Sequence, residues 1–256
     1  PAPFGLKFPI EYRADIGDAV RSDVFLLTAS AVGTYQEKVH EFRYVEPPSV
    51  TRQLYQDVER DWAADGAETR YSVKREGWLA QLAAGVIPAD FAAGPAYFPN
   101  KAKEAAHFLS NELAGEQAIL WSRFIPEAEG VAETLEKAKI RVGLIHGKIK
   151  PPERERLRDR FLAGKLDAVV CQPKVAAKGL DFSSASVAIF TSNYWDLETR
   201  AQCLERTNHP MKKRKKATLV VDIVTPGTVE EDICSGLDKK WKSTRFFMRK
   251  VRARRR

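Results

Sequence analysis

From residue 100 to residue 240, short apolar runs alternate with segments in which apolar residues recur every three or four positions. The short runs predict buried β-strands, and the longer segments predict amphipathic helices. Strands that alternate with helices fold as right-handed βαβ units, which build a mainly parallel sheet with helices on both faces. We therefore expect an α/β, doubly wound fold. The expected strands are residues 117–121, 141–145, 167–171, 187–190 and 219–224, and the expected helices lie near residues 102–113, 131–138 and 151–161, around residue 202 and from about residue 228 onward.

The first 97 residues carry a weaker pattern. Residues 38–45 alternate between apolar and polar side chains, as a strand does, and residues 50–62 have an apolar side chain at every fourth position, as an amphipathic helix does. We expect Gly66 to end that helix and residues 78–84 to form a second short one. Residues 85–100 contain three Pro and two Gly and are the best candidate for a linker. These patterns divide the chain into a smaller α-rich linking segment (1–97), a main lobe (98–245) and a basic tail (246–256).

The positive charge of the chain is concentrated near its C-terminus. The 256 residues carry a net charge of +8, and residues 206–256 contain 16 Lys or Arg against five Asp or Glu. The rest of the chain is therefore close to neutral. A basic end on a near-neutral body predicts a polyanionic partner, with nucleic acid favoured over a membrane. The alternative is a solvated tail that binds nothing.

Neither the apolar runs nor the cysteines point to a membrane or to secretion. No apolar run approaches the roughly 20 residues that a membrane-spanning helix needs. The N-terminus has no charged segment followed by an apolar stretch, so no secretory signal is visible. The three cysteines are widely spaced and include no CxxC pair, which indicates reduced thiols. We expect a cytoplasmic protein of a bacterium or a phage-infected host, with the nucleus as the alternative.

Two pieces of sequence between residues 168 and 209 carry the strongest functional signal. The apolar run 168–171 is followed by a loop that contains Gly179, and loops at the carboxyl ends of parallel strands bind phosphates through backbone N–H groups. About twenty residues later, Gln202 and Arg206 are four residues apart on an expected helix, so that both side chains can reach one point. This combination is typical of a nucleotide-driven machine.

Both pieces resemble motifs of superfamily-two helicases. Residues 175–181 (VAAKGLD) are similar to motif V of that family, and residues 202–209 (QCLERTNH) are similar to motif VI. The sequence departs from the family pattern at Pro173, where the family usually has Thr, and at Lys178, which is often Arg. It also departs at His209, which stands at the position of the second motif VI arginine.

Further segments resemble the same family in the expected order. They cover residues 100–240 well, and they imply that the doubly wound sheet is RecA-like. A looser resemblance upstream points to the Swi/Snf-like branch of double-stranded DNA translocases. The segments are residues 118–124 (motif IV), residues 143–148 with the following helix, residues 224–231 (the closing strand and helix) and residues 45–55 (the Swi/Snf-like approach).

The resemblance assigns roles to individual residues. It implies that Gly179, Asp181 and His209 lie near bound ATP and that Gln202 and Arg206 meet its phosphates. Phosphoryl transfer depends mainly on positioning and on charge neutralisation, and a planar guanidinium suits both tasks. The expected nucleic-acid contacts are Ser122, Arg123, Gly147, Lys148 and Lys174, and the charge of the basic tail adds Arg254 and Arg255.

Two of these assignments have competing interpretations. Arg206 could be an ordinary surface arginine paired with Glu198 or Glu205. His209 stands where a permanent charge is expected, and a neutral imidazole cannot supply that charge. It also lacks neighbouring Cys or His at metal-ligand spacing, so we predict no metal site in the chain.

The phosphate-binding half of a motor is missing from the 256 residues. No GxxxxGK[ST] sequence and no Asp-Glu box for Mg²⁺ occurs. We therefore expect that ATP and Mg²⁺ are held mainly by a first RecA-like lobe, in the same full-length chain or in another subunit. The chain begins with Pro1, which is consistent with a processed protein or a fragment.

These observations support one main hypothesis and one alternative. The chain is expected to be the second motor lobe of a DNA-dependent ATPase, a helicase or translocase that is inactive without its partner lobe. In this role it supplies an arginine finger and part of the DNA track. The alternative is a catalytically degenerate helicase-like lobe that binds nucleic acid or acts as a scaffold, and Pro173, Glu205 and His209 favour it. The sequence leaves open DNA versus RNA, unwinding versus translocation, and polarity.

Overall fold

The structure is a computed structural model of residues 1–256, in which residues 38–91, 97–176, 179–207 and 218–253 are described. All of these residues belong to one compact unit, Gln36–Arg256. Three predicted site residues, His209, Arg254 and Arg255, lie outside the described residues.

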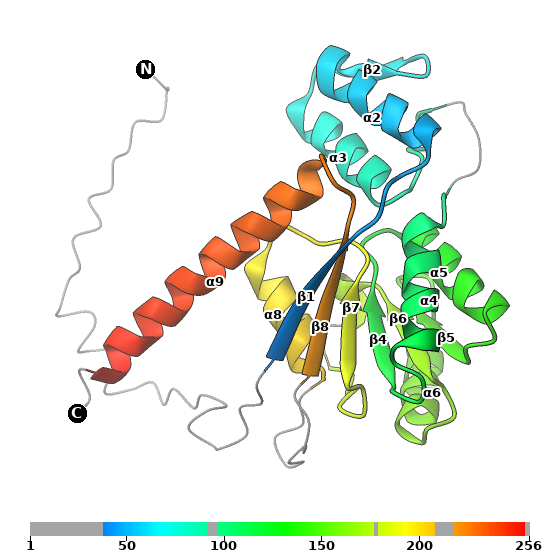
Figure 1. The fold of residues 1–256 in the computed structure, drawn as a ribbon, viewed down its shortest axis with the longest axis vertical. Helices are drawn as coiled ribbons and strands as arrows, with labels where there is room; N and C mark the ends of the chain where they lie inside the picture. Colours follow the sequence, from blue (N-terminus) through cyan, green and yellow to red (C-terminus); the bar gives the residue numbers. More distant parts are fainter. Residues whose placement is uncertain (1–37, 92–96, 177–178, 208–217, 254–256) are drawn as a thin grey trace. The chain divides into compact units, whose positions relative to one another are not determined.

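A six-stranded sheet forms the centre of this unit, and every pair of neighbouring strands in it is parallel (Figure 1). The strand order is β1-β8-β7-β4-β6-β5, so the chain crosses between strands that are not consecutive. This arrangement confirms the predicted α/β, doubly wound fold. The strands are β1 (Lys38–Tyr44), β4 (Ala118–Trp121), β5 (Val142–Ile145), β6 (Ala168–Cys171), β7 (Val187–Phe190) and β8 (Thr218–Val224).

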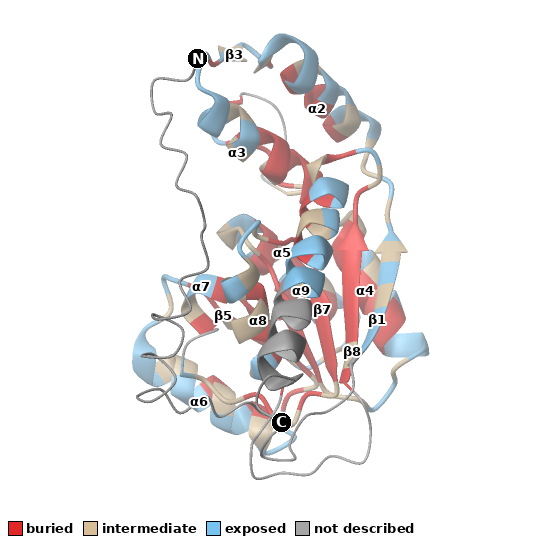
Figure 2. Cartoon of the chain, turned by 90° about the vertical axis from the view of Figure 1, so that its left-hand side faces the viewer, coloured by how far each residue is buried: buried red, intermediate tan, exposed pale blue. Residues whose placement is uncertain are grey.

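Helices cover both faces of the sheet, and the central strands are therefore buried on both sides. Along β4, Ala118 and Leu120 pack into the core beneath α4 and α5, whereas Ile119 and Trp121 pack into the core beneath α6, α7 and α8. All residues of β4, β6 and β7 are buried, as Figure 2 shows in red. The helices are α4 (Asn100–Asn111), α5 (Ile125–Lys137), α6 (Pro151–Leu162), α7 (Pro173–Ala176), α8 (Leu197–Glu205) and α9 (Val229–Ala253).

The predicted strand near residues 38–45 is confirmed as β1, and the structure also gives its place in the sheet. β1 lies beside β8, with a register that runs from Lys38 opposite Thr218 to Tyr44 opposite Val224. It therefore belongs to the sheet of the main lobe, although it comes before residue 98. The proposed division at residues 97 and 245 stays a prediction.

Two helices, α2 (Ser49–Asp61) and α3 (Ser72–Ala83), pack together ahead of the lobe around a small core of their own. The prediction that Gly66 ends the first of them is wrong. α2 ends at Asp61 because Trp62 takes a left-handed conformation (φ 57°) and its N–H donates to the carbonyl of Val58. Gly66 instead lies in the turn of a hairpin formed by β2 (Ala63–Ala64) and β3 (Ala67–Glu68).

The two ends of the segment predicted as a linker are bonded to each other. The N–H of Phe98 donates to the carbonyl of Gly85 across 2.7 Å. Gly85 has a φ of +82°, and a side chain there would place its Cβ 2.7 Å from the carbonyl oxygen of Phe98, so only glycine fits. Within the described ranges, no helix combines the length and the apolar character that crossing a bilayer requires.

Candidate nucleotide and nucleic-acid site

The loops that carry the predicted site residues follow strands that end at one edge of the sheet. β7, β4, β6 and β5 are consecutive neighbours, and all run in the same direction. Ser122 and Arg123 follow β4, Gly147 and Lys148 come shortly after β5, and Lys174 follows β6. The described nucleic-acid candidates therefore gather at the carboxyl edge, where α/β sheets bind their ligands.

A buried polar cluster fixes the loops after β4 and β7. The hydroxyls of Thr191 and Ser192 donate to the two carboxylate oxygens of Glu127 at 2.6 and 2.7 Å. The hydroxyl of Ser122 lies 2.8 Å from that of Thr191, and the N–H of Arg123 donates to the Ser192 hydroxyl at 2.8 Å. Burial raises the pKa of Glu127, and the hydroxyl hydrogen bonds oppose that rise. Ser122 is fully buried, so it contributes the position of its loop rather than an exposed hydroxyl.

Gln172 ties three of these loops together. Its side-chain nitrogen donates to the carbonyl of Arg123 at 3.2 Å, and its side-chain oxygen accepts from the N–H of Gly147 at 3.3 Å. Its backbone N–H donates to the carbonyl of Ile145. Gln172 is not among the predicted site residues, although a polar residue directly after a fully apolar strand is a usable signal.

Gly179 and Asp181 belong to the loop that follows α7. Gly179 has a φ of +85°, which favours glycine, and an added Cβ would find no atom within 4 Å. The space beside this glycine can therefore admit another group. The carboxylate of Asp181 accepts the N–H of Ser183 at 2.8 Å, which closes a local turn. The next residue, Phe182, donates its N–H to the carbonyl of Arg206 at 3.1 Å, so this loop is bonded to the end of α8.

Gln202 and Arg206, whose side chains were expected to reach one point, make separate contacts. The amide of Gln202 donates to the carboxylate of Glu198 at 2.9 Å, and Nε of Arg206 lies 3.4 Å from the carbonyl of Gln202. The alternative pairing of Arg206 with Glu198 or Glu205 is absent, and no other carboxylate of the described part of the chain pairs with Arg206. The half-buried guanidinium of Arg206 therefore keeps its charge available for an anion.

A buried ion pair holds α8 against the sheet. Arg200 donates two hydrogen bonds of 2.7 Å to the carboxylate of Asp222, and the side chain of Asn193 bonds to both residues. Nε2 of His40 lies 2.5 Å from the same carboxylate. Burial alone would raise the pKa of Asp222, but the Arg200 guanidinium and the hydrogen bonds from His40 and Asn193 hold it well below its usual value. Since α8 carries Arg206, this pair fixes the helix from which Arg206 projects.

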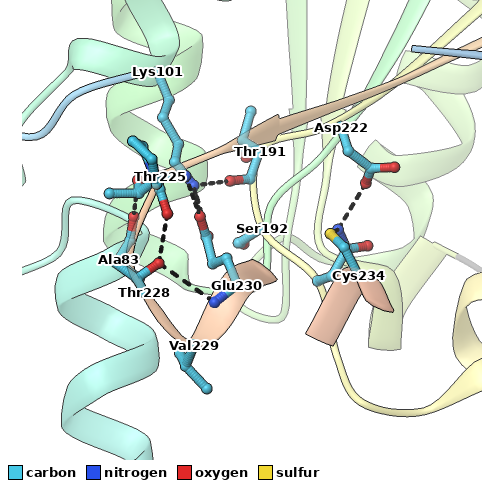
Figure 3. Close-up of polar contacts among 12 residues, drawn as sticks. Ala83, Lys101, Thr191, Ser192, Asp222, Thr225, Thr228, Val229, Glu230 and Cys234 are labelled. Carbon is cyan, nitrogen blue, oxygen red and sulfur yellow. Dashed lines mark hydrogen bonds and ion pairs between the residues drawn. The ribbon is translucent and has the colours of Figure 1, made fainter. Parts of the chain in front are cut away.

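A second buried ion pair connects α4 with the start of α9 (Figure 3). Nζ of Lys101 lies 2.6 and 2.5 Å from the carboxylate oxygens of Glu230 and donates to the carbonyl of Thr191 at 2.9 Å. The N–H of Thr225 also donates to Glu230. Burial raises the pKa of Glu230 to about 7, although Lys101 and Thr225 act in the opposite direction.

The chain shares sequence with helicase C-terminal domains. Residues 100–210, fewer than half of the chain, match the family model of the helicase conserved C-terminal domain. A DNA 3'-5' translocase XPB2 of Sulfurisphaera tokodaii is 27% identical over 119 residues, which are 46% of this chain and 25% of that protein. An ATP-dependent rRNA helicase rrp3 of Sclerotinia sclerotiorum is 30% identical over 100 residues, which are 39% of this chain and 20% of that protein.

The bifunctional helicase and thymine dioxygenase JBP2 of Trypanosoma brucei brucei is 29% identical over 92 residues, 36% of this chain and 8% of that protein. The chain therefore spans a quarter or less of the length of these relatives.

The fold is also shared with a solved structure, the C-terminal part of the Fun30 ATPase domain. The TM-score is 0.58 with 10% sequence identity, over 79% of this chain and 89% of that one. The sheet is therefore RecA-like, and the matching part of the chain is similar to the second lobe of superfamily-two helicases and translocases.

Proposed function

We propose that this chain is the second motor lobe of a nucleic-acid-dependent ATPase of the helicase or translocase type, in the Swi/Snf-like branch. One observation carries the proposal. The loop of Gly179 and Asp181 is bonded to the end of α8 through Phe182 and Arg206, and the guanidinium of Arg206 has no carboxylate partner in the described part of the chain. A glycine loop beside an uncompensated arginine suits a phosphate that arrives from outside the chain.

In this proposal, the chain contributes positive charge to the site, and a first lobe holds the nucleotide. ATP and Mg²⁺ together supply the transferable phosphoryl group and the neutralisation of its charge. Arg206 neutralises the charge that develops on the transferred group, with Gln202 beside it. Gly179 and Asp181 line the near side of the nucleotide, and the resemblance to motif VI also assigns His209 to ATP binding. Mg²⁺ is assigned to the first lobe together with the nucleotide, because the 256 residues contain no Asp-Glu box for it.

The nucleic-acid track follows the carboxyl edge of the sheet. Gly147, Lys148 and Lys174 are exposed there, and Arg123 is half-buried beside them. The buried cluster around Glu127 and the Gln172 bridge hold these loops in place before any ligand arrives. Pre-formed positive sites of this kind bind the phosphate backbone with little dependence on sequence. Arg254 and Arg255 extend the proposed track in the basic tail.

We favour DNA over RNA, because the resemblance upstream of the lobe points to double-stranded DNA translocases. The relatives include both a DNA translocase and an rRNA helicase by name. The binding experiment below therefore compares DNA with RNA. We also assign the protein to the cytoplasm of a bacterium or an infected host, with the nucleus as the alternative.

The second candidate function is a degenerate lobe that binds nucleic acid without supporting hydrolysis. Two observations favour this degenerate lobe. Pro173, where the family usually has Thr, is buried at the start of α7 and offers no hydroxyl. The amide of Gln202 donates to the carboxylate of Glu198, a contact that competes with a phosphate.

Binding by the chain itself tests the nucleic-acid half of the proposal. Fluorescence anisotropy would be measured over a range of salt with a labelled DNA duplex, its single strand and an RNA duplex of the same sequence. Replacing Lys148 or Lys174 with Ala should weaken duplex DNA binding and lower the slope of log K against log salt by roughly 0.9 for each phosphate that the variant no longer neutralises. Lys137→Ala is the matched control, because Lys137 is an exposed lysine on α5 that is paired with Glu133. Equal effects of all three variants would contradict the proposed track.

A further inference from the structure

Tyr194, which is not among the predicted site residues, lies between two of the proposed track cations. The guanidinium carbon of Arg123 is 4.8 Å from the centre of its ring, and Nζ of Lys174 is 5.2 Å from the same centre. The Tyr194 hydroxyl also donates to the carbonyl of Arg123 at 3.4 Å. The three residues follow β7, β4 and β6, which are adjacent in the sheet, so one aromatic ring serves the ends of three neighbouring strands.

The backbone that carries Tyr194 is held on its N-terminal side. Asn193 is buried and bonded to Arg200 and Asp222. The hydroxyl of Ser192 donates to the buried carboxylate of Glu127. The ring therefore projects from a loop whose position is fixed by buried polar contacts, and it can act as a platform for flexible side chains.

An aromatic ring and a carboxylate orient a cation with different consequences. A carboxylate compensates the positive charge and would compete with a phosphate, whereas the ring quadrupole attracts the cation and leaves its net charge intact. Burial raises the pKa of Tyr194, although Arg123 opposes this, so the ring carries no charge at neutral pH. No carboxylate of the described segments pairs with Arg123 or Lys174. Both charges therefore remain available at the edge of the sheet.

We propose that Tyr194 is a positioning residue that holds Arg123 and Lys174 ready for phosphates of one nucleic-acid strand. The inference rests on the proposed function, because it adds a residue to the same track. It also explains why two exposed or half-exposed cations sit at this edge beside a tyrosine rather than a carboxylate. The ring contributes by reducing the freedom that Arg123 and Lys174 would otherwise lose on binding.

The test compares two replacements of Tyr194 in the 256-residue chain with a labelled DNA duplex. Tyr194→Phe keeps the ring and should bind within about twofold of the unaltered chain, because the attraction belongs to the ring face. Tyr194→Leu removes the ring and should weaken binding by about tenfold, the effect of about two cation–π contacts. Its log K against log salt slope should fall by up to ~1.8, since two phosphate contacts are loosened. Tyr71→Leu is the control, because Tyr71 is 76% exposed between α2 and α3 and far from these loops in sequence.

A double-mutant comparison separates positioning from direct contact. In a chain that already carries Arg123→Ala and Lys174→Ala, Tyr194→Leu should cause no further loss of affinity. A further loss with an unchanged salt slope would show that the ring contacts a base directly, and it would overturn the positioning role. Unaltered binding by Tyr194→Leu would overturn the inference alone. Failure of the unaltered chain to bind any nucleic acid would overturn the proposed function and the inference together.

Discussion

The backbone N–H of Phe182 donates to the backbone carbonyl of Arg206 across 3.1 Å, and this bond joins two segments that are separated by β7 and α8. It places the loop of Gly179 and Asp181 against the end of the helix that presents Arg206. Because the bond is made by main-chain atoms, replacing the Arg206 side chain should leave the bond intact. The contribution of the guanidinium can therefore be tested separately from the architecture.

Asp222→Asn should destabilise the fold strongly. The change leaves the buried Arg200 without its carboxylate, and breaking one side of a buried ion pair costs about 3–5 kcal/mol. Chemical denaturation at neutral pH measures the loss. An Arg200→Met, Asp222→Asn double variant is the control and should lose less than the single variant, because no unpaired charge stays buried. A single variant as stable as the unaltered chain would contradict this role.

The Arg200–Asp222 ion pair should make the fold resistant to acid. The pKa of Asp222 is lowered in the folded state, so its contribution is present above the unfolded value of about 3.9 and is lost as the pH falls through the lower folded value. Denaturation curves recorded at successively lower pH should show the gap between the unaltered chain and Asp222→Asn closing only in strong acid. If this difference in the free energy of unfolding disappears near neutral pH, a group other than Asp222 causes it.

The contribution of Glu230 to the free energy of unfolding should have the opposite pH dependence. Burial raises its folded pKa to about 7, so the protonated form favours the fold; this contribution is complete below the unfolded pKa and is lost as the pH rises through about 7. Relative to a Lys101→Met, Glu230→Gln double variant, the unaltered chain should lose roughly 3 kcal/mol of unfolding free energy between about pH 4 and about pH 8. Urea denaturation across this range provides the measurement. Parallel pH profiles for the two proteins would show that Glu230 does not titrate in this window.

Truncating the chain before Arg249 should weaken nucleic-acid binding and flatten its salt dependence. The removed residues include Arg254 and Arg255, and each phosphate contact contributes roughly 0.9 to the slope of log K against log salt. Anisotropy titrations of the full and shortened chains on the same duplex measure the difference. An unchanged slope would identify the basic arm as a solvated tail.

The repeating units of the fold could be predicted because each depends on local sequence. The apolar runs at β4, β6 and β7 and the amphipathic helices between them carry their own periodicity. The place of β1 could not be predicted in this way, since its pairing with β8 joins residues about 180 positions apart. The end of α2 was misassigned because Trp62, rather than a glycine, takes the left-handed conformation.

The candidate site was predictable in position but not in its supporting contacts. Family motifs indicated Arg123, Gly179 and Arg206. The topology places the loop of Arg123 at the carboxyl edge of the sheet, and the hydrogen bond between Phe182 and Arg206 joins the Gly179 loop to the end of α8. Glu127 and Tyr194 gave no signal in the sequence, because a helical glutamate and a loop tyrosine are ordinary surface residues. Their roles depend on contacts with residues 20 to 71 positions away.

The central claim is that Arg206 supplies charge to phosphoryl transfer on a nucleotide held by another lobe. The direct measurement is ATP hydrolysis, with saturating ATP and DNA, by the complete motor that joins this chain to its nucleotide-binding lobe. Arg156→Ala is the control, because Arg156 is an exposed arginine of α6 paired with Glu153. Arg206→Ala should lower the rate by roughly 10³-fold or more, with DNA affinity and stability unchanged, whereas the control should hydrolyse normally. Full turnover by Arg206→Ala would contradict the claim.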